Sequence, residues 1–163
     1  MEKGVKKYLG SIVLGLNDAL VELTGVLAGL TFALQNSKII VISGFITGIV
    51  ASLSMASSEY LSTKVEYNKK RPKIAAIYTG VAYILTVLFL IFPYLILSNV
   101  YHSLVWTLIN SVIVILTFTY YISIEENRSF KHRFLEMFFI SFGVAAISFV
   151  IGYFIRIFFG VEV

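Results

Sequence analysis

The sequence predicts an all-α integral membrane protein with five transmembrane helices, and three observations support this fold class. First, 58% of the 163 residues are hydrophobic and only 13% are charged, with a mean hydropathy of +0.89. Soluble domains have roughly 45–50% apolar and about 25% charged residues. Second, long apolar runs follow one another with short polar breaks between them. Third, the basic residues gather at alternate breaks. We expect one transmembrane domain over residues 1–163, in contact with the lipid bilayer.

Each predicted span is an apolar run that approaches or exceeds the length needed to cross the hydrocarbon layer, which is about 20 helical residues. The five spans are residues 9–34, 39–63, 74–97, 102–123 and 134–159. The polar breaks between them are residues 35–38, 67–73, 97–99 and 125–128.

The positions of the basic residues predict the orientation. All but two of the 13 Lys and Arg residues precede the first span or follow the second and fourth spans; the exceptions are Lys38 and Arg156. By the positive-inside rule the face that carries the majority is cytoplasmic. An odd number of spans then places the N-terminus in the cytoplasm and the C-terminus outside. This arrangement also explains the sequence pI of about 9.3 without nucleic acid as a partner.

Polar residues are unevenly distributed among the spans. The third and fourth spans consist largely of Ile, Leu, Val, Tyr and Phe, whereas the first two carry carboxylates, hydroxyls and a methionine. We interpret the Tyr and Phe residues of the last three spans as lipid-facing and interfacial side chains. The functional residues are therefore expected on the first two helices.

Asp18 and Glu22 are four residues apart in the first span and share one face of the helix. With the helix beginning near Tyr8, they lie about 15 Å and about 21 Å from its cytoplasmic end at 1.5 Å per residue. A carboxylate at that depth costs roughly 2.5–3.5 kcal/mol on insertion scales, so it is expected to face protein, water or a cation. The alternative for Asp18 is a structural hydrogen bond to Asn17, Thr24 or a neighbouring helix, and for Glu22 a hydrogen bond across a dimer interface.

The second span carries a stripe of possible ligands. Met55, Glu59, Ser62 and Glu66 follow the spacing of one helical face. Carboxylates suit hard or borderline divalent cations, and a thioether adds a preference for transition metals over calcium or magnesium. The stripe therefore predicts metal binding by Asp18, Glu22, Met55, Glu59 and Glu66. Asp18 and Glu22 are also the expected proton-coupling groups, because protons and a bound cation compete for the same carboxylates.

Purely structural roles are the alternatives for Met55, Glu59 and Glu66. Met55 alone is typical of a filler of gaps in a hydrophobic core. Glu59 is alternatively an interfacial carboxylate paired with Lys64 or a serine hydroxyl, and Glu66 a partner of Lys70 one helical turn away.

Two glycine pairs and several missing motifs complete the pattern. Gly25 with Gly29, and Gly44 with Gly48, have the GxxxG spacing that permits close packing of membrane helices. The sequence contains no nucleophile with a base, no glycine-rich phosphate loop and no histidine cluster, so we expect neither an enzyme nor a prosthetic group. Five helices are few for a complete polar pathway, which favours a homodimer.

The segments GLNDAL (15–20), LAGL (27–30), Ser43-Gly44 and SLSMASSEYLS (52–62) resemble the vacuolar iron transporter family, over about residues 10–66. The resemblance implies a homodimer of five-helix protomers that exchanges Fe(II) for protons along a path at the dimer axis. It implies that Asp18 is the functional aspartate and Met55 the metal-binding methionine. It also implies a plasma membrane location in a prokaryote and a vacuole-like membrane in a eukaryote.

This chain departs from the plant members of that family in two places. Thr47 stands where they have a glutamate, and the chain lacks their long cytoplasmic helical domain after the second span. We hypothesise that Glu22 supplies the missing carboxylate, and that Glu59 and Glu66 form a reduced loading site.

The resulting functional prediction is proton-coupled export of Fe(II), with Mn(II) as a second candidate substrate, from the cytoplasm. Two alternatives remain open at this point. One is a proton-coupled carrier of a non-metal solute, for which Met55 would be dispensable. The other is a non-transporting membrane partner of a soluble iron-handling protein.

Overall fold

The computed structural model describes residues 7–66, 71–126 and 129–159, and this part of the chain is all-α. Its five long helices are α2 (Leu9–Leu34), α3 (Ser37–Val65), α4 (Pro72–Ile96), α5 (Val100–Glu126) and α6 (Phe130–Phe159). All of them are long and apolar enough to cross a membrane. The predicted all-α fold with five helices long enough to span a membrane is thus confirmed, and α6 begins at Phe130 rather than at residue 134.

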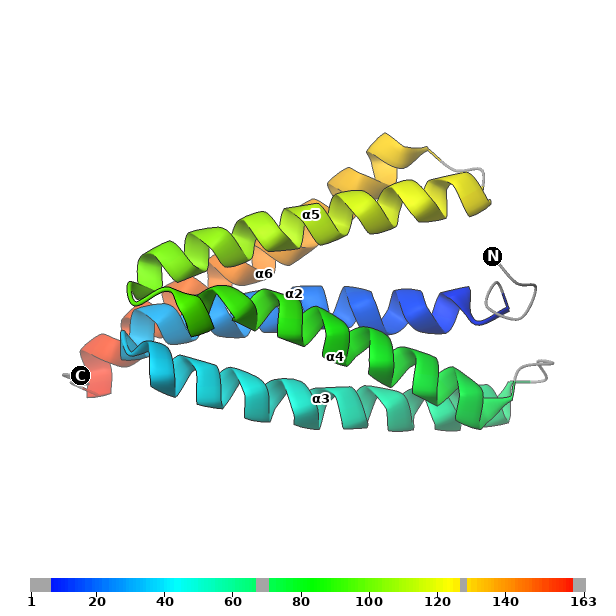
Figure 1. Cartoon of the computed structure of the whole chain (residues 1–163), viewed down its shortest axis with the longest axis horizontal. Helices are drawn as coiled ribbons and strands as arrows, with labels where there is room; N and C mark the ends of the chain where they lie inside the picture. The colour runs from blue at the N-terminus through cyan, green and yellow to red at the C-terminus, as the bar shows by residue number, and fades with distance from the viewer. Residues whose placement is uncertain (1–6, 67–70, 127–128, 160–163) are drawn as a thin grey trace.

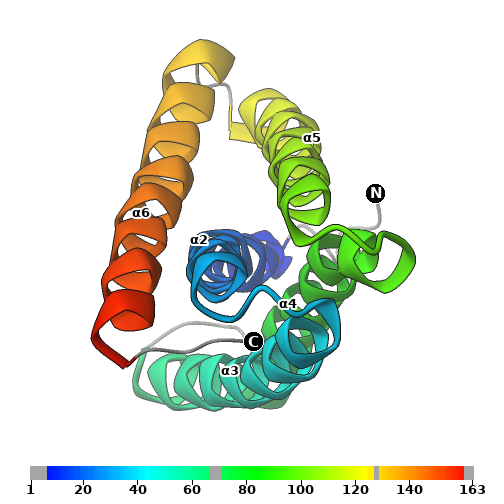
Figure 2. The ribbon, with the colours of Figure 1, turned by 90° about the vertical axis from the view of Figure 1, so that its left-hand side faces the viewer.

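The helices run up and down along one long axis, with successive helices antiparallel (Figure 1). Viewed along the bundle, α2 lies in the centre and the other four helices surround it (Figure 2). The helix that carries Asp18 and Glu22 is therefore the helix most enclosed by protein.

Asparagine caps define the two turns at the end of the bundle where α2 finishes. Gln35 adopts a left-handed conformation with φ 51°, and the Asn36 side chain then accepts hydrogen bonds from the backbone N–H groups of Lys38 and Ile39 at 3.1 and 3.2 Å. Asn99 caps α5 in the same way, through the N–H groups of Tyr101 and His102. Each cap satisfies N–H groups that a helix start leaves unpaired.

A proline inside α4 fastens α5 to it. Pro93 has no N–H, so the carbonyl of Phe89 lacks the partner that a regular helix would supply. The Asn110 side chain of α5 donates a hydrogen bond to this carbonyl at 3.1 Å. One turn along α5, the Thr107 hydroxyl donates to the carbonyl of Leu90 at 2.8 Å.

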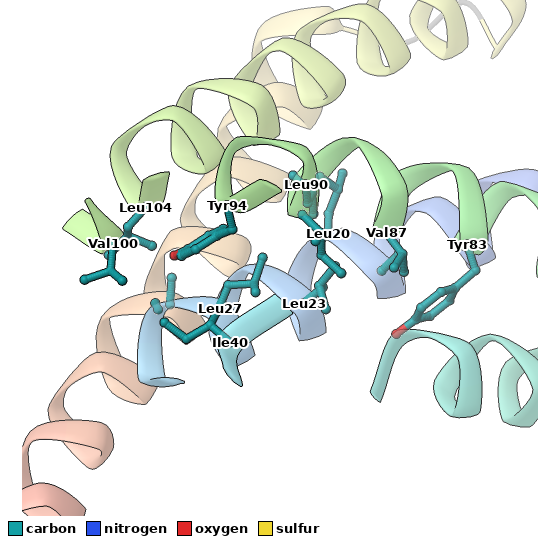
Figure 3. Packing of buried hydrophobic residues seen from close by; sticks show 14 of the residues in the cluster. Leu20, Leu23, Leu27, Ile40, Tyr83, Val87, Leu90, Tyr94, Val100 and Leu104 are labelled. Atoms are coloured by element: carbon teal, nitrogen blue, oxygen red, sulfur yellow. The ribbon is translucent and has the colours of Figure 1, made fainter. Parts of the chain in front are cut away.

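The buried core joins α2 to α4 (Figure 3). Its largest buried side chains include Leu20, Leu23 and Leu27 of α2 and Val87 and Leu90 of α4.

Two tyrosines of α4 also lie in this core: Tyr83 is 0% exposed and Tyr94 is 3% exposed. The interpretation of tyrosines in the last three spans as lipid-facing is therefore wrong for these two. The physical reason is that each hydroxyl has a hydrogen-bond partner on α2, the half-buried Glu22 for Tyr83 and the buried Thr31 for Tyr94.

The two GxxxG pairs lie at close contacts with different helices. A Cβ atom at Gly29 would lie 3.0 Å from the carbonyl oxygen of Ser148 in α6, and one at Gly152 of α6 would overlap the carbonyl of Gly29 itself. A Cβ atom at Gly25 would meet Ser148 and Val144 of the same helix at 3.0 Å.

The pair on α3 faces α4 instead. A Cβ atom at Gly48 would lie 2.6 Å from the Val87 side chain, and one at Gly44 would lie 3.2 Å from Ile91 and from Leu27 of α2. The glycines therefore bring α2 against α6 and α3 against α4.

Candidate functional site

The candidate site is a cavity of about 540 Å³ between α2 and α3. Asp18 and Glu22 line it from α2. The lining from α3 consists of Ile46, Thr47, Val50, Ala51, Ser54, Met55 and Ser58. Three of the five predicted metal ligands thus meet in one cavity, which combines two carboxylates, one thioether and three hydroxyls.

The cavity exists because α3 is held mainly by α4. Besides the Gly48–Val87 contact, a Cβ atom at Gly80 of α4 would lie 3.3 Å from Ala56 of α3. Helix α4 also touches α2 closely, since a Cβ atom at Gly15 would overlap the carbonyl of Thr79. Helix α4 therefore fixes both neighbours and leaves space between their central turns.

The cavity lies beside the middle of α2, which corresponds to mid-membrane depth if the helix spans the bilayer. Glu22 is 13 residues from Leu9 and 12 from Leu34, so at 1.5 Å per residue it lies about 20 Å from one end of α2 and about 18 Å from the other. Asp18 lies one turn nearer the end where α2 begins. Charged side chains at this depth are expensive and are a mark of function.

Asp18 borders two cavities. It also lines a space of about 360 Å³ on another side of α2, together with Asn17 and Val21. The Oδ1 atom of Asn17 is buried and has no hydrogen-bond partner among the described residues. Within the same part of the chain, no donor contacts the Asp18 carboxylate. The structural hydrogen bonds that were the alternative for Asp18 are therefore absent from the described residues.

Glu22 has a defined partner within its own protomer. The hydroxyl of Tyr83 donates a hydrogen bond to its Oε2 atom at 2.7 Å. Tyr83 could not be singled out from the sequence, because a tyrosine in an apolar span has no signal that separates it from an interfacial one. The hydrogen bond to a charged group is of the stronger kind.

Met55 and Thr47 form part of the α3 side of the site. Both line the cavity that Glu22 faces from α2. Glu22 and Thr47 thus share one lining, and the hypothesis that Glu22 replaces a carboxylate absent at position 47 stays a prediction. The role of these residues in metal binding stays a prediction.

Glu59 lies outside the lining of the cavity. It is largely buried, and its Oε1 atom accepts a hydrogen bond from the Ser11 hydroxyl of α2 at 2.6 Å. The Ser11 carbonyl in turn accepts a hydrogen bond from Thr79 of α4 at 2.9 Å. This arrangement matches the alternative of a carboxylate paired with a serine hydroxyl, and it ties three helices together near the start of α2.

Glu66 is exposed and caps the end of α3, where its N–H donates to the carbonyl of Ser62 at 3.0 Å. Its suggested partner Lys70 lies outside the described residues. The stripe that runs from Met55 to Glu66 is therefore not gathered into one site.

No three His, Asp or Glu side chains lie together as a metal-binding group in residues 7–66, 71–126 and 129–159. The cavity instead offers two carboxylates with a thioether. Such a set is suited to loose and reversible binding of a borderline divalent ion, because a closed structural site uses four strong ligands.

In a comparison with protein-family models, residues 9–71 match the VIT family. This match confirms the resemblance to the vacuolar iron transporters that the sequence motifs indicate. No curated protein matches the chain. The matched residues include α2 and α3, so the segment that builds the cavity is the segment that matches the VIT family, and this match indicates a membrane transporter of metal ions.

Proposed function

We propose that this protein is a proton-coupled exporter of Fe(II), with Mn(II) as the second candidate substrate, and that the ion passes through the cavity between α2 and α3. The observation that carries the proposal is the lining itself: Asp18, Glu22 and Met55 face one cavity at mid-membrane depth. Carboxylates with a thioether favour a borderline transition metal over the hard cations.

Proton coupling follows from the same carboxylates. Asp18 has no donor to hold its charge among the described residues, and it lies near the middle of a long apolar helix. A carboxylate in such surroundings binds either a proton or a cation, and the two compete. Exchange of one for the other on opposite sides of the membrane is antiport.

A second copy of the chain is proposed to complete the path. Ser54 and Ser58 line the cavity from α3 and are exposed in the protomer. Polar side chains at this depth are expected to face protein or water rather than lipid. A homodimer that covers this face would give the ion a path with protein on both sides.

The distribution of charge supports a cytoplasmic location of the end where α2 begins. The described basic residues at that end of the bundle are Lys7, Lys64, Arg71, Lys73, Lys131 and Arg133. Lys38 and Arg156 lie toward the opposite end. By the positive-inside rule the substrate would enter the cavity from the α2 start.

The test is uptake of Fe(II) and Mn(II) by liposomes that contain the purified protein, with and without a pH gradient. The variants are Asp18→Ala and Met55→Ala, and the control is Met137→Ala, a thioether of α6 outside the cavity. We expect gradient-dependent uptake by the parent and the control, and its loss in both site variants.

Each alternative has its own result in this experiment. Uptake that survives Met55→Ala while Asp18→Ala abolishes it would favour protons with a non-metal solute. A folded parent dimer without any metal uptake would overturn the transport proposal and favour a membrane partner of a soluble protein.

A further inference from the structure

Tyr83 of α4 does not line the cavity itself but contacts Glu22, one of the two carboxylates that do. It projects from α4 with its hydroxyl oxygen at the far end of a fully buried ring (Figure 3). The turns on either side of it are the ones that hold α3, through the contacts Gly80–Ala56 and Val87–Gly48. The backbone of α4 at Tyr83 is therefore held in place, and the buried ring has little freedom to move.

The hydrogen bond from Tyr83 constrains how Glu22 can bind an ion. The hydroxyl donates to Oε2 at 2.7 Å, which leaves Oε1 as the oxygen of that carboxylate without a hydrogen bond among the described residues. A cation that took both oxygens would have to displace the phenolic proton or share Oε2 with it. Binding through a single oxygen preserves the hydrogen bond.

The loss of binding free energy that this constraint causes differs between cations. Ca²⁺ takes six to eight oxygen ligands and commonly uses a carboxylate through both of its oxygens. A transition metal that already has a thioether ligand needs fewer oxygens and accepts one oxygen from each carboxylate. A hydrogen bond that holds Glu22 in single-oxygen binding thus disfavours Ca²⁺ more than Fe(II) or Mn(II).

We propose that Tyr83 is a specificity-determining positioning residue, which holds the Glu22 carboxylate in single-oxygen geometry and thereby discriminates against Ca²⁺. The inference rests on the proposed function, because it takes Glu22 as a ligand of the transported ion. Tyr83 itself contacts no ion and acts through Glu22.

The experiment measures the ratio of the Ca²⁺ and Mn²⁺ dissociation constants of the purified protein. The probe is the Mn²⁺ electron paramagnetic resonance signal, which reports Mn²⁺ displaced by added Ca²⁺. The test variant is Tyr83→Phe, which removes only the hydroxyl. The matched control is Tyr94→Phe, a second buried tyrosine of α4 whose hydroxyl is hydrogen-bonded to Thr31 away from the cavity.

In Tyr83→Phe we expect the ratio of the Ca²⁺ to the Mn²⁺ dissociation constant to fall on the order of tenfold, which is the size of effect expected for one hydrogen bond. Tyr94→Phe should keep the parent ratio. In a Glu22→Gln background, adding Tyr83→Phe should leave the ratio unchanged, because a residue that acts through Glu22 has nothing left to position. A merely structural role of Tyr83 would still produce a change in that background.

Three results would overturn the inference but leave the proposed function standing. The parent could bind Mn²⁺ while Tyr83→Phe keeps the parent ratio of dissociation constants. Alternatively, Tyr94→Phe could change the ratio as much as Tyr83→Phe does, or the effects of Glu22→Gln and Tyr83→Phe could add in the double variant. A parent that binds neither metal would overturn the proposed function as well. If Tyr83→Phe does not fold, Glu22→Asp serves as the second variant, since the shorter side chain withdraws from the Tyr83 hydroxyl. It is expected to raise competition by Ca²⁺, and an unchanged ratio would contradict the proposal.

Discussion

Two faces of α2 differ sharply in how they are packed. Toward α6 and α4 the helix presents glycines, and Gly29 and Gly15 meet the backbones of those helices directly. Toward the middle of α3 it presents Asp18 and Glu22, and a cavity separates the two helices. One side of α2 is thus packed rigidly against neighbouring helices, and another side lines a cavity.

Because of this contrast, we expect residues important for stability and residues important for function to lie on different faces of α2. Backbone contacts between glycines resist any added atom, because protein interiors tolerate little extra volume. The cavity side has room for an ion or water, so a change of charge there should leave packing intact. Substitutions on the two faces are therefore expected to produce different kinds of defect.

The largest expected effect is on transport, from a change on the cavity face. Asp18→Asn keeps the shape of the side chain but removes its charge, so metal uptake by liposomes should fall at least about 100-fold. Loss of a residue that only contacts a metal ligand typically costs roughly 10- to 100-fold, and loss of a ligand itself should cost more. The thermal unfolding temperature should stay close to that of the parent. Loss of folded protein instead of transport would show that Asp18 belongs to the packed face.

The next effect is on stability, from a change at the packed face. Gly152→Ala places a Cβ atom against the carbonyl of Gly29, so we expect a loss of about 3 kcal/mol, the upper end of the range for overpacking. The matched control is Gly143→Ala in the same helix, where an added Cβ atom has nothing within 4 Å. Unfolding in a denaturing detergent measures both. Equal stability of the two variants would contradict the rigid contact.

The third prediction tests whether Glu59 belongs to the cavity face. Ser11→Ala removes the donor to a largely buried carboxylate, so the free energy of unfolding should fall by about 1–2 kcal/mol. Transport per folded molecule should be unchanged, because Glu59 does not line the cavity. Ser57→Ala, whose hydroxyl bonds to its own helix at the Leu53 carbonyl, is the control. A transport defect at full stability would place Glu59 on the ion path, as the sequence hypothesis of a loading site holds.

The smallest expected effect lies away from both faces. Asn110→Ala leaves the Phe89 carbonyl without its side-chain donor, and we expect a loss of about 0.5–1 kcal/mol because this carbonyl lies near the protein surface. The measurement is again unfolding in denaturing detergent. If Pro93→Ala is introduced together with Asn110→Ala, the restored backbone N–H should recover part of the loss. A loss as large as that of Gly152→Ala would mean that the α4–α5 contact is also a rigid one.

The sequence was sufficient to predict the helices, because the length and composition of an apolar run decide whether it crosses a membrane. It was also sufficient to choose Asp18, Glu22 and Met55, since carboxylates in an apolar helix and a methionine in a recognised motif are local signals. These three residues line one cavity. The sequence was insufficient for Glu59, whose spacing places it on the stripe of Met55 although the structure pairs it with Ser11.

Apolar length, polar breaks and the positions of the charged residues can thus be read directly along the chain. The contacts of the α2 glycines with α6, of Glu59 with Ser11 and of Tyr83 with Glu22 became visible in the folded bundle alone. The physical reason is that helical periodicity fixes which residues share a face of one helix. It does not fix how a neighbouring helix is rotated, and that rotation selects which buried hydroxyl meets which carboxylate.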